Sequence, residues 1–207
     1  IKHLVTPKNL IMDVGSTKRD VVDAAERTLG PQLTAFVPAH PIAGKELAGV
    51  EHADPDLYIG KKVILTPNER TATTHIKKAE HVWKALGCQV VYMTPDAHDK
   101  AYAAISHLPH LLAFAYMNGI ISQPEGTDFL SLAGSGFKDF TRIAASDPKV
   151  WRDIFSVNKD QILAQSRQFR LSLRELELAI AKNEMNEMHS LIDHARKSRM
   201  NWTDSNK

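Results

Sequence analysis

The sequence predicts an α/β region followed by an all-helical region, with the change near Thr94-Pro95. Before this point, short apolar segments alternate with longer segments of helical periodicity, as in an open and largely parallel sheet. After it, apolar residues recur at steps of three and four throughout. We therefore expect an α/β domain at residues 1–95 and a helical domain at residues 96–207.

Strands in the first region are expected where short apolar segments end at glycine, proline or polar residues. A helix over 18–29 should close at Gly30-Pro31. A second helix over 71–86 should close at Gly87, because glycine favours the left-handed backbone that follows a helix. The expected strands are residues 10–14, 35–37, 62–65 and 89–93.

Helices account for the remainder of the chain. Asp147-Pro148 predicts a helix start, because aspartate caps the first N–H groups and proline fits the first helical position. Pro109 has no N–H and should kink its helix where the carbonyl of Ile105 loses its donor. The expected helices are residues 97–118, 127–132, 137–145, 148–157, 159–181 and 184–199.

The composition is that of a globular protein and argues against several kinds of partner. The chain has 207 residues, 43% of them hydrophobic, and its 26 basic and 24 acidic residues are interleaved without long runs. Interleaved charges of both signs argue against a nucleic-acid-binding surface, which needs clustered lysine and arginine. A membrane span is not expected either, because the sequence has no apolar run of about 18 residues. The single cysteine, Cys88, excludes an internal disulfide and fits a reducing cytoplasm. No metal site is expected, because the histidine segment has no cysteine or acidic partner at zinc-ligand spacing.

Four motifs carry the functional signal. In the second of them, His40 follows an apolar segment on a backbone bent by Pro41 and loosened by Gly44, which is typical of a general base placed just after a strand. A neutral imidazole suits that role because its ordinary pKa lies near physiological pH. The motifs are Asp13-Val14-Gly15-Ser16-Thr17-Lys18, His40-Pro41-Ile42-Ala43-Gly44, Ser106-His107-Leu108-Pro109-His110 and the segment 134–143.

Together and in this order, the four motifs resemble the prephenate dehydrogenase family of tyrosine biosynthesis, which includes the arogenate dehydrogenases. The resemblance covers residues 10–199 and implies a Rossmann-type sheet followed by a helical dimerisation domain. It also implies NAD(P)-dependent oxidative decarboxylation of prephenate to 4-hydroxyphenylpyruvate in the cytoplasm. The alternatives are an arogenate or dual-specificity cyclohexadienyl dehydrogenase and, from another class, a non-catalytic dimerisation fragment.

The family opens with a glycine-rich turn that cradles the pyrophosphate of the dinucleotide at a helix N-terminus. This sequence contains no G-x-G-x-x-G, and Gly134-Ser135-Gly136 lies after the long helical segment. We therefore expect a truncated chain that lacks the first half of the Rossmann-type domain, binds NAD or NADP poorly and is inactive alone. The residue that selects NAD or NADP would lie in the missing part, so that choice stays open.

The resemblance gives His40 and Ser16 the central roles. His40 would accept the proton of the C4 hydroxyl of the substrate, and Ser16 would contact His40, this hydroxyl and the nicotinamide. From the residues alone, Ser16 could also be a helix N-cap. Arg142 would bind a substrate carboxylate, and Lys138, four residues earlier on the same helical face, would add positive potential.

The resemblance also places Ser106, His107 and His110 in the substrate pocket, with His110 favoured over His107 as the ligand contact. Trp151 could close the pocket or be a core residue, and Glu46 could pair with the ammonium of arogenate. The residues expected to be solvated or capping are His98-Asp99, His52 and His75.

Both closing helices carry broad apolar stripes, which predict either packing within their own domain or a subunit interface. A helical domain of about 110 residues has little interior to absorb such faces. The resemblance implies an intertwined homodimer through this domain, so we favour the interface. The stripe residues are Ile162, Leu163, Phe169, Leu173, Leu176 and Ile180, followed by Met185, Met188, Leu191 and Ile192.

Overall fold

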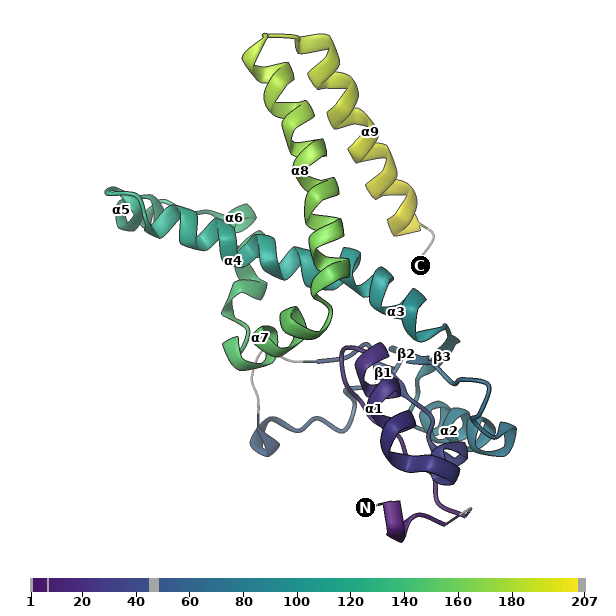
Figure 1. Ribbon diagram of the computed structural model, residues 1–207. Helices are drawn as coiled ribbons and strands as arrows, with labels where there is room; N and C mark the ends of the chain where they lie inside the picture. The colour runs from purple at the N-terminus through teal and green to yellow at the C-terminus, as the bar shows by residue number, and fades with distance from the viewer. Residues whose placement is uncertain (1, 7, 45–48, 205–207) are drawn as a thin grey trace. The chain divides into compact units, whose positions relative to one another are not determined.

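The computed structural model describes residues 2–6, 8–44 and 49–204, and the chain divides into two compact units (Figure 1). The first unit, Ile1–Ile162, holds a small sheet and most of the helices. The second unit, Leu163–Lys207, holds the two long closing helices, the first of which begins in the preceding unit. The boundary expected near residue 95 lies within the first unit, so the two-domain division stays a prediction.

The sheet has the strand order β1 (Ala39–Pro41), β2 (Lys62–Leu65) and β3 (Gln89–Tyr92). β2 and β3 run parallel and are joined by the crossover helix α2 (Thr73–Ala85), whereas β1 and β2 run antiparallel. In its described part, the connection from β1 to β2 contains only the 3-10 helix Val50–His52, and antiparallel neighbours need no crossover helix. The expected parallel pairing therefore holds for β2 and β3, and the sheet as a whole is mixed.

The strands expected at 10–14 and 35–37 are reduced to a single parallel bridge around Ile11. The N–H of Ile11 donates to the carbonyl of Ala35, and the N–H of Val37 donates to the carbonyl of Ile11, both at 2.9 Å. These two bonds keep the segments side by side without extending them into strands.

His40 lies inside β1, opposite Ile64 of β2, and not in a loop after a strand as the sequence suggested. The backbone continues to pair with β2 beyond it, because the N–H of Ile42 donates to the carbonyl of Lys62 at 2.8 Å. A strand position fixes an imidazole more rigidly than a loop does.

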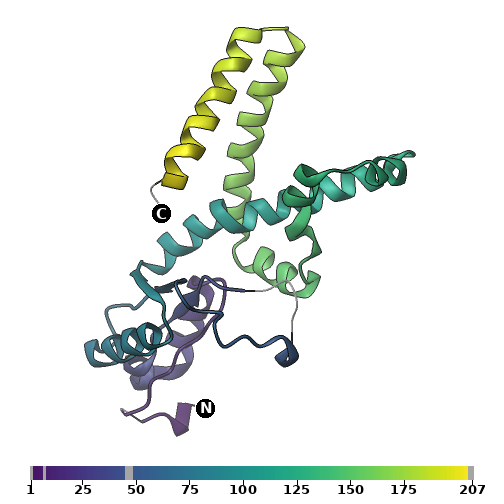
Figure 2. The same cartoon turned by 180° about the vertical axis from the view of Figure 1, so that it is seen from behind.

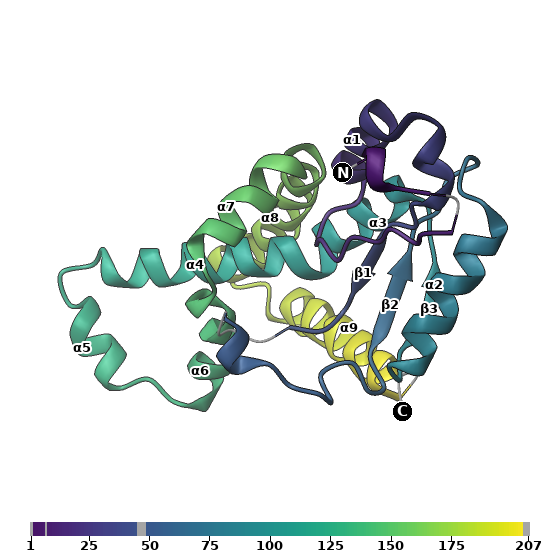
Figure 3. The same cartoon turned by 90° about the horizontal axis from the view of Figure 1, so that it is seen from below.

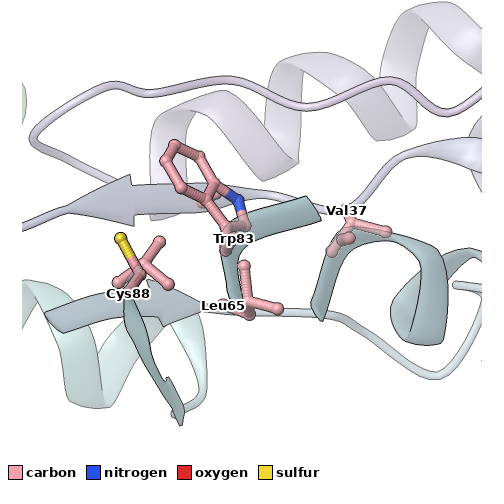
Figure 4. Packing of buried hydrophobic residues seen from close by; sticks show 7 residues of the cluster. Val37, Leu65, Trp83 and Cys88 are labelled. Atoms are coloured by element: carbon pink, nitrogen blue, oxygen red, sulfur yellow. The ribbon is translucent and has the colours of Figure 1, made fainter. Parts of the chain in front are cut away.

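Helix α2 lies alongside β2 and β3 (Figure 3). Trp83 of α2 is buried against Val37 and Leu65 from the sheet region, and Cys88 belongs to the same cluster (Figure 4). The thiol of Cys88 is therefore a packed core group, as its position before β3 suggested.

Both helices of the α/β region end at the glycines that the sequence indicated. α1 (Arg19–Leu29) is followed by Gly30 with φ 56°, and α2 is followed two residues later by Gly87 with φ 85°. A Cβ at Gly87 would also lie 3.2 Å from Cα of Ile59, so both backbone conformation and space favour glycine there.

After β3, three helical segments form one nearly continuous rod: α3 (Pro95–Tyr102), the π-helical segment η4 (Ala103–His107) and α4 (Leu108–Ile121) (Figure 1). At the end of η4 the N–H of Leu108 donates five residues back along the chain, where an α-helix would donate four back. The disturbance expected at Pro109 is therefore a π-helical turn, a feature that is frequent at functional sites.

The first unit continues with α5 (Gly126–Ser131), α6 (Ser135–Thr141), the 3-10 helix η5 (Arg142–Ala145) and α7 (Pro148–Val157). Asp147 caps α7 as expected, because its carboxylate accepts two N–H groups of the first turn at 2.7 and 3.2 Å.

The closing helices α8 (Lys159–Ala181) and α9 (Met185–Asp204) form an antiparallel hairpin (Figure 2). No helix in the described ranges is long and apolar enough to span a membrane. Many apolar side chains of this hairpin are exposed, among them Leu171, Leu173, Leu178, Ile180, Met185 and Ile192.

Candidate active site

His40 is the first member of a row of three hydrogen-bonded side chains. Its Nδ1 lies 2.8 Å from Nε2 of His98, and Nδ1 of His98 lies 2.7 Å from Oδ1 of Asp99. His98 is fully buried on α3, and the ring of Tyr102, one turn later, stacks on it at a centroid distance of 4.5 Å. The row therefore runs from a half-buried imidazole to a buried carboxylate.

Asp99 also caps helix α1 from outside that helix. Its carboxylate accepts the backbone N–H of Lys18 at 2.9 Å and that of Arg19 at 3.0 Å. Burial alone would raise the pKa of Asp99, but the hydrogen bonds from His98 and from these two N–H groups outweigh it and lower the pKa below its ordinary value. Asp99 is therefore an anion at physiological pH.

Lys18 is completely buried and pairs with Asp13. Its Nζ also donates to the carbonyl of Ala39 at 2.8 Å, while Asp13 accepts the N–H of Ala39 at 3.1 Å. Burial lowers the pKa of Lys18, and the charge of Asp13 opposes this effect. Because the pair holds both polar groups of the residue before His40, the first motif serves to position the second.

His40 is uncharged at physiological pH. Burial, together with the smaller effects of the neighbouring His98 and Lys18, lowers the pKa of His40 to about 3. The pKa of His40 therefore differs from the ordinary histidine pKa, near physiological pH, on which the sequence argument relied. A neutral imidazole has a lone pair that can accept a proton.

The row lies at the carboxyl ends of the parallel strands. His40 pairs with Ile64, the residue before the last of β2, and α3, which carries His98, follows β3 after two residues. In open α/β sheets this edge is where ligands bind.

His107 is locked into the wall of the site. It is fully buried, and its Nδ1 lies 3.1 Å from Nδ2 of Asn158, which also donates to the carbonyl of Asp99 at 2.8 Å. Burial lowers the pKa of His107 to about 4. These contacts give His107 a structural role. The preference for His110 as the ligand contact stays a prediction.

His110 is half-buried and is oriented by two neighbours. Its Nδ1 donates to the carbonyl of Ser106 at 2.9 Å, and its ring stacks on Trp151 at a centroid distance of 3.6 Å. Burial lowers the pKa of His110, and the positive charge of Arg142 adds to this effect. The structure thus brings Ser106, His110, Trp151 and Arg142 together, with Ser106 acting through its backbone.

Trp151 is 9% exposed, so it is both a core residue and one wall of this cluster. Its ring also contacts His107, Phe114 and Phe155 at centroid distances of 6.1, 6.2 and 5.5 Å. Arg142 begins η5 and Lys138 lies in α6, and both side chains are exposed. Their binding of a carboxylate stays a prediction.

The predicted roles of Glu46 and Ser16 stay predictions. Glu46 lies outside the described residues. In the described part of the chain the Ser16 hydroxyl makes no hydrogen bond, and the N-cap position of α1 is occupied by Lys18. Ser16 is therefore not the helix cap, because Asp99 satisfies the N–H groups there, and its contact with His40 stays a prediction.

The prediction that His98-Asp99, His52 and His75 are solvated or capping was wrong for two of the histidines. His98 and His75 are buried, whereas His52 is exposed and Asp99 does cap a helix, although not its own. The sequence signal that was missed is the spacing of His98 and Tyr102, which places both on one face of a helix that begins at Thr94-Pro95.

The turn before α1 does not form a cradle for a pyrophosphate. A Cβ at Gly15 would lie 3.1 Å from Oδ2 of Asp13 and 3.8 Å from Nζ of Lys18, so the turn is closed around its own ion pair. This turn therefore has no room for a phosphate beside Gly15.

A polar site at the carboxyl ends of parallel strands, followed by a helical region, is the arrangement of a nucleotide-dependent enzyme with a second, helical domain. Two family profiles match the chain. The profile described as "Prephenate dehydrogenase, nucleotide-binding domain" matches residues 1–92, and "Prephenate dehydrogenase, dimerization domain" matches residues 94–194. The chain belongs to the prephenate dehydrogenase family.

The relatives cover most of this chain. It is 39% identical over 159 residues to a prephenate dehydrogenase of Bacillus subtilis (strain 168), covering 74% of this chain and 42% of that protein. It is 31% identical over 194 residues to a cyclohexadienyl dehydrogenase of Zymomonas mobilis, covering 92% of this chain and 65% of that protein. The chain thus spans only part of the length of these relatives.

Solved structures share the fold. The prephenate dehydrogenase of Aquifex aeolicus in complex with hydroxyphenyl propionate and NAD+ matches with a TM-score of 0.89 and 40% identity, over 97% of this chain and 69% of that chain. The arogenate dehydrogenase of Synechocystis matches with a TM-score of 0.83 and 26% identity, over 97% and 72% of the two chains.

Proposed function

We propose that the protein is an NAD- or NADP-dependent dehydrogenase that oxidises and decarboxylates prephenate to 4-hydroxyphenylpyruvate. The observation that carries this proposal is the buried row of His40, His98 and Asp99, which holds a neutral imidazole at the ligand edge of the sheet. Membership of the family supplies the reaction, and the row supplies a base suited to it.

The proposed reaction forms no covalent bond between the substrate and the protein. A hydride leaves C4 of the ring for the bound nicotinamide, the ring carboxylate departs as CO₂, and its electron pair completes the aromatic ring. The C4 hydroxyl becomes a carbonyl for the moment between these events and a phenol afterwards. No proton is released overall, so the base that takes the hydroxyl proton also returns it.

His40 is our candidate for that base. Its imidazole is neutral, half-buried and held by β1 on one side and by His98 on the other. We propose that Ser16, on the neighbouring turn, orients the hydroxyl and the nicotinamide, as the family resemblance implies.

The cluster of His110, Trp151 and Arg142 is our candidate for the part that binds the substrate. Arg142 would hold a carboxylate with two parallel hydrogen bonds, with Lys138 adding positive charge. His110, stacked on Trp151, presents Nε2 as its remaining polar atom, because its Nδ1 proton is committed to the carbonyl of Ser106.

Arogenate is the alternative substrate, either alone or beside prephenate. The matches to a cyclohexadienyl dehydrogenase of Zymomonas mobilis and to an arogenate dehydrogenase of Synechocystis favour keeping it. Glu46 would then pair with the ammonium of arogenate. We also propose a cytoplasmic location, which the single unpaired Cys88 supports.

Turnover of the full protein on both substrates, each with NAD and with NADP, tests this function through the absorbance of the reduced nicotinamide. We expect turnover of prephenate with at least one cofactor. If neither substrate is oxidised with either cofactor, the chain is the non-catalytic dimerisation fragment considered above.

We propose further that two copies associate through the helical region. The exposed apolar side chains of α8 and α9 support this, because a monomer in water rarely leaves so many large apolar groups uncovered. The match to a profile named for dimerisation supports it as well.

A further inference from the structure

We propose that His98 and Asp99 relay the proton that His40 accepts. As His40 takes the hydroxyl proton of the substrate at Nε2, the proton on its Nδ1 passes to Nε2 of His98, and Asp99 stabilises the cation so formed. His98 and Asp99 are positioning residues, since both act through His40. The inference rests on the proposed function, in which His40 is the base.

The hydrogen bonds fix the direction of the relay. The carboxylate of Asp99 can only accept, and it faces the backbone N–H groups of Lys18 and Arg19 and Nδ1 of His98. His98 therefore carries its proton on Nδ1 and has a lone pair on Nε2. This lone pair faces Nδ1 of His40 at 2.8 Å, so His40 donates there and keeps a free lone pair on Nε2.

The surroundings place a positive charge better on His98 than on His40. The positive charge of Lys18 acts against a charge on His40, and the more distant carboxylate of Asp99 favours it. A charge on His98 lies directly against the carboxylate of Asp99, 2.7 Å away. In a buried site such a difference in charge placement is weakly screened.

Burial also keeps the proton available for return. His98 has no exposed surface, and Tyr102 stacks on its ring from the same helix. The phenol of Tyr102 stays protonated, because burial raises its pKa to about 12, so it adds no negative charge beside the pair. A proton that His98 accepts can therefore leave only through His40. This suits a reaction that releases no proton overall.

The 15N resonances of the imidazole rings in the 207-residue chain test the starting arrangement without any turnover. We expect His40 and His98 each to carry the proton on Nδ1 at neutral pH. A proton on Nε2 of His40 overturns the relay, because the lone pair would then face His98 and not the substrate.

The full protein with His98→Gln tests the proton transfer itself. The glutamine carbonyl can still accept the hydrogen bond from His40, but it cannot take up a proton. We expect kcat to fall roughly 10²-fold with a much smaller change in KM. Asp99→Asn should lower kcat similarly and carries the same test where His98→Gln does not fold. His75→Gln, which removes another buried histidine, should leave kcat unchanged.

The solvent isotope effect separates a relay from a purely structural role. In mixtures of H₂O and D₂O, two protons moving together give a curved dependence of kcat on the deuterium fraction, and His98→Gln should make it linear. A linear dependence in the unmodified protein, or an unchanged kcat in His98→Gln, overturns the relay. A protein that turns over neither substrate would instead overturn the proposed function, while the imidazole resonances still decide the hydrogen-bond direction.

Discussion

His40 owes its position to residues on both sides of it. Asp13 and Lys18 hold the backbone of Ala39 on one side, and His98 holds the imidazole on the other. The first motif therefore has a structural use that its resemblance to a family does not reveal. Removing one member of the buried ion pair should lower stability strongly, because the remaining charge would lose its opposite charge.

Lys18→Met should lower the free energy of unfolding by about 3 kcal/mol or more, since it removes the lysine ammonium from the carboxylate of Asp13 and from the carbonyl of Ala39. Denaturant titration measures this loss. The matched control is Lys84→Met, which breaks the exposed pair with Glu80 and should cost less than about 1 kcal/mol. Equal losses in the two variants would show that the buried pair does not hold β1.

Arg142→Ala should chiefly raise KM in the full protein. A charge-assisted pair with a substrate carboxylate contributes on the order of 2–5 kcal/mol, much of it from the carboxylate left unpaired. Steady-state kinetics should show a smaller change in kcat than in KM. Lys138→Ala serves as the comparison. An unchanged KM in Arg142→Ala, with a raised KM in Lys138→Ala, would assign the carboxylate to the lysine.

Among the helices and strands, the helix ends were predicted most reliably from the sequence. Gly30, Gly87 and Asp147-Pro148 all mark helix ends as expected, because caps depend on the residues at the end itself. The strand limits were less predictable, because pairing with β2 decides where β1 begins. The role of His40 therefore stays a prediction, and its place in the fold, inside β1, differs from the loop that the sequence suggested.

The burial of His98-Asp99 could not be read from the sequence for a related reason. Polar residues in the first turn of a helix are usually solvated, and a local pattern gives no sign of what packs against them. Here the N-terminus of α1 supplies two N–H groups to Asp99, and β1 supplies His40 to His98. These contacts join segments about 60 to 80 positions apart in sequence, beyond the reach of any periodicity argument.

The hairpin of α8 and α9 should mediate self-association. We expect sedimentation of the chain at micromolar concentration to show a dimer, with a buried area of more than about 2,000 Å² as in obligate interfaces. Leu173→Glu would place a charge on the exposed apolar face and should favour the monomer, whereas Arg167→Glu on the same helix should have less effect. A stable folded monomer of the unmodified chain would contradict the interface.

For the molecule as a whole, buried histidines make stability depend on pH. In the unfolded chain His40 and His107 take up protons as the pH falls through about 6.5, whereas in the folded chain their pKa values are lowered to about 3 and about 4. The unfolded state thus binds more protons in this window, so stability falls as the pH falls from about 6.5 towards 4. Each histidine contributes at most about 1.4 kcal/mol per pH unit.

Thermal unfolding of the chain between pH 7 and pH 4.5 measures this dependence. We expect the melting temperature to fall steadily on acidification, and His107→Gln to flatten the curve because one of the two linked groups is gone. A melting temperature that is constant or rises over this range would show that the histidines are charged in the folded chain.

The kinetics of His40→Asn in the full protein test most directly whether His40 is the base. Asparagine keeps a hydrogen-bonding group near the hydroxyl but cannot take up a proton near neutral pH, so kcat should fall about 10²–10⁴-fold while KM changes far less. The acid limb of kcat/KM in the unmodified protein should lie below pH 6.5, because burial lowers the pKa of His40, and it should vanish in the variant. A variant that retains more than about a tenth of the original kcat, or the same acid limb, would contradict the assignment of His40 as the base.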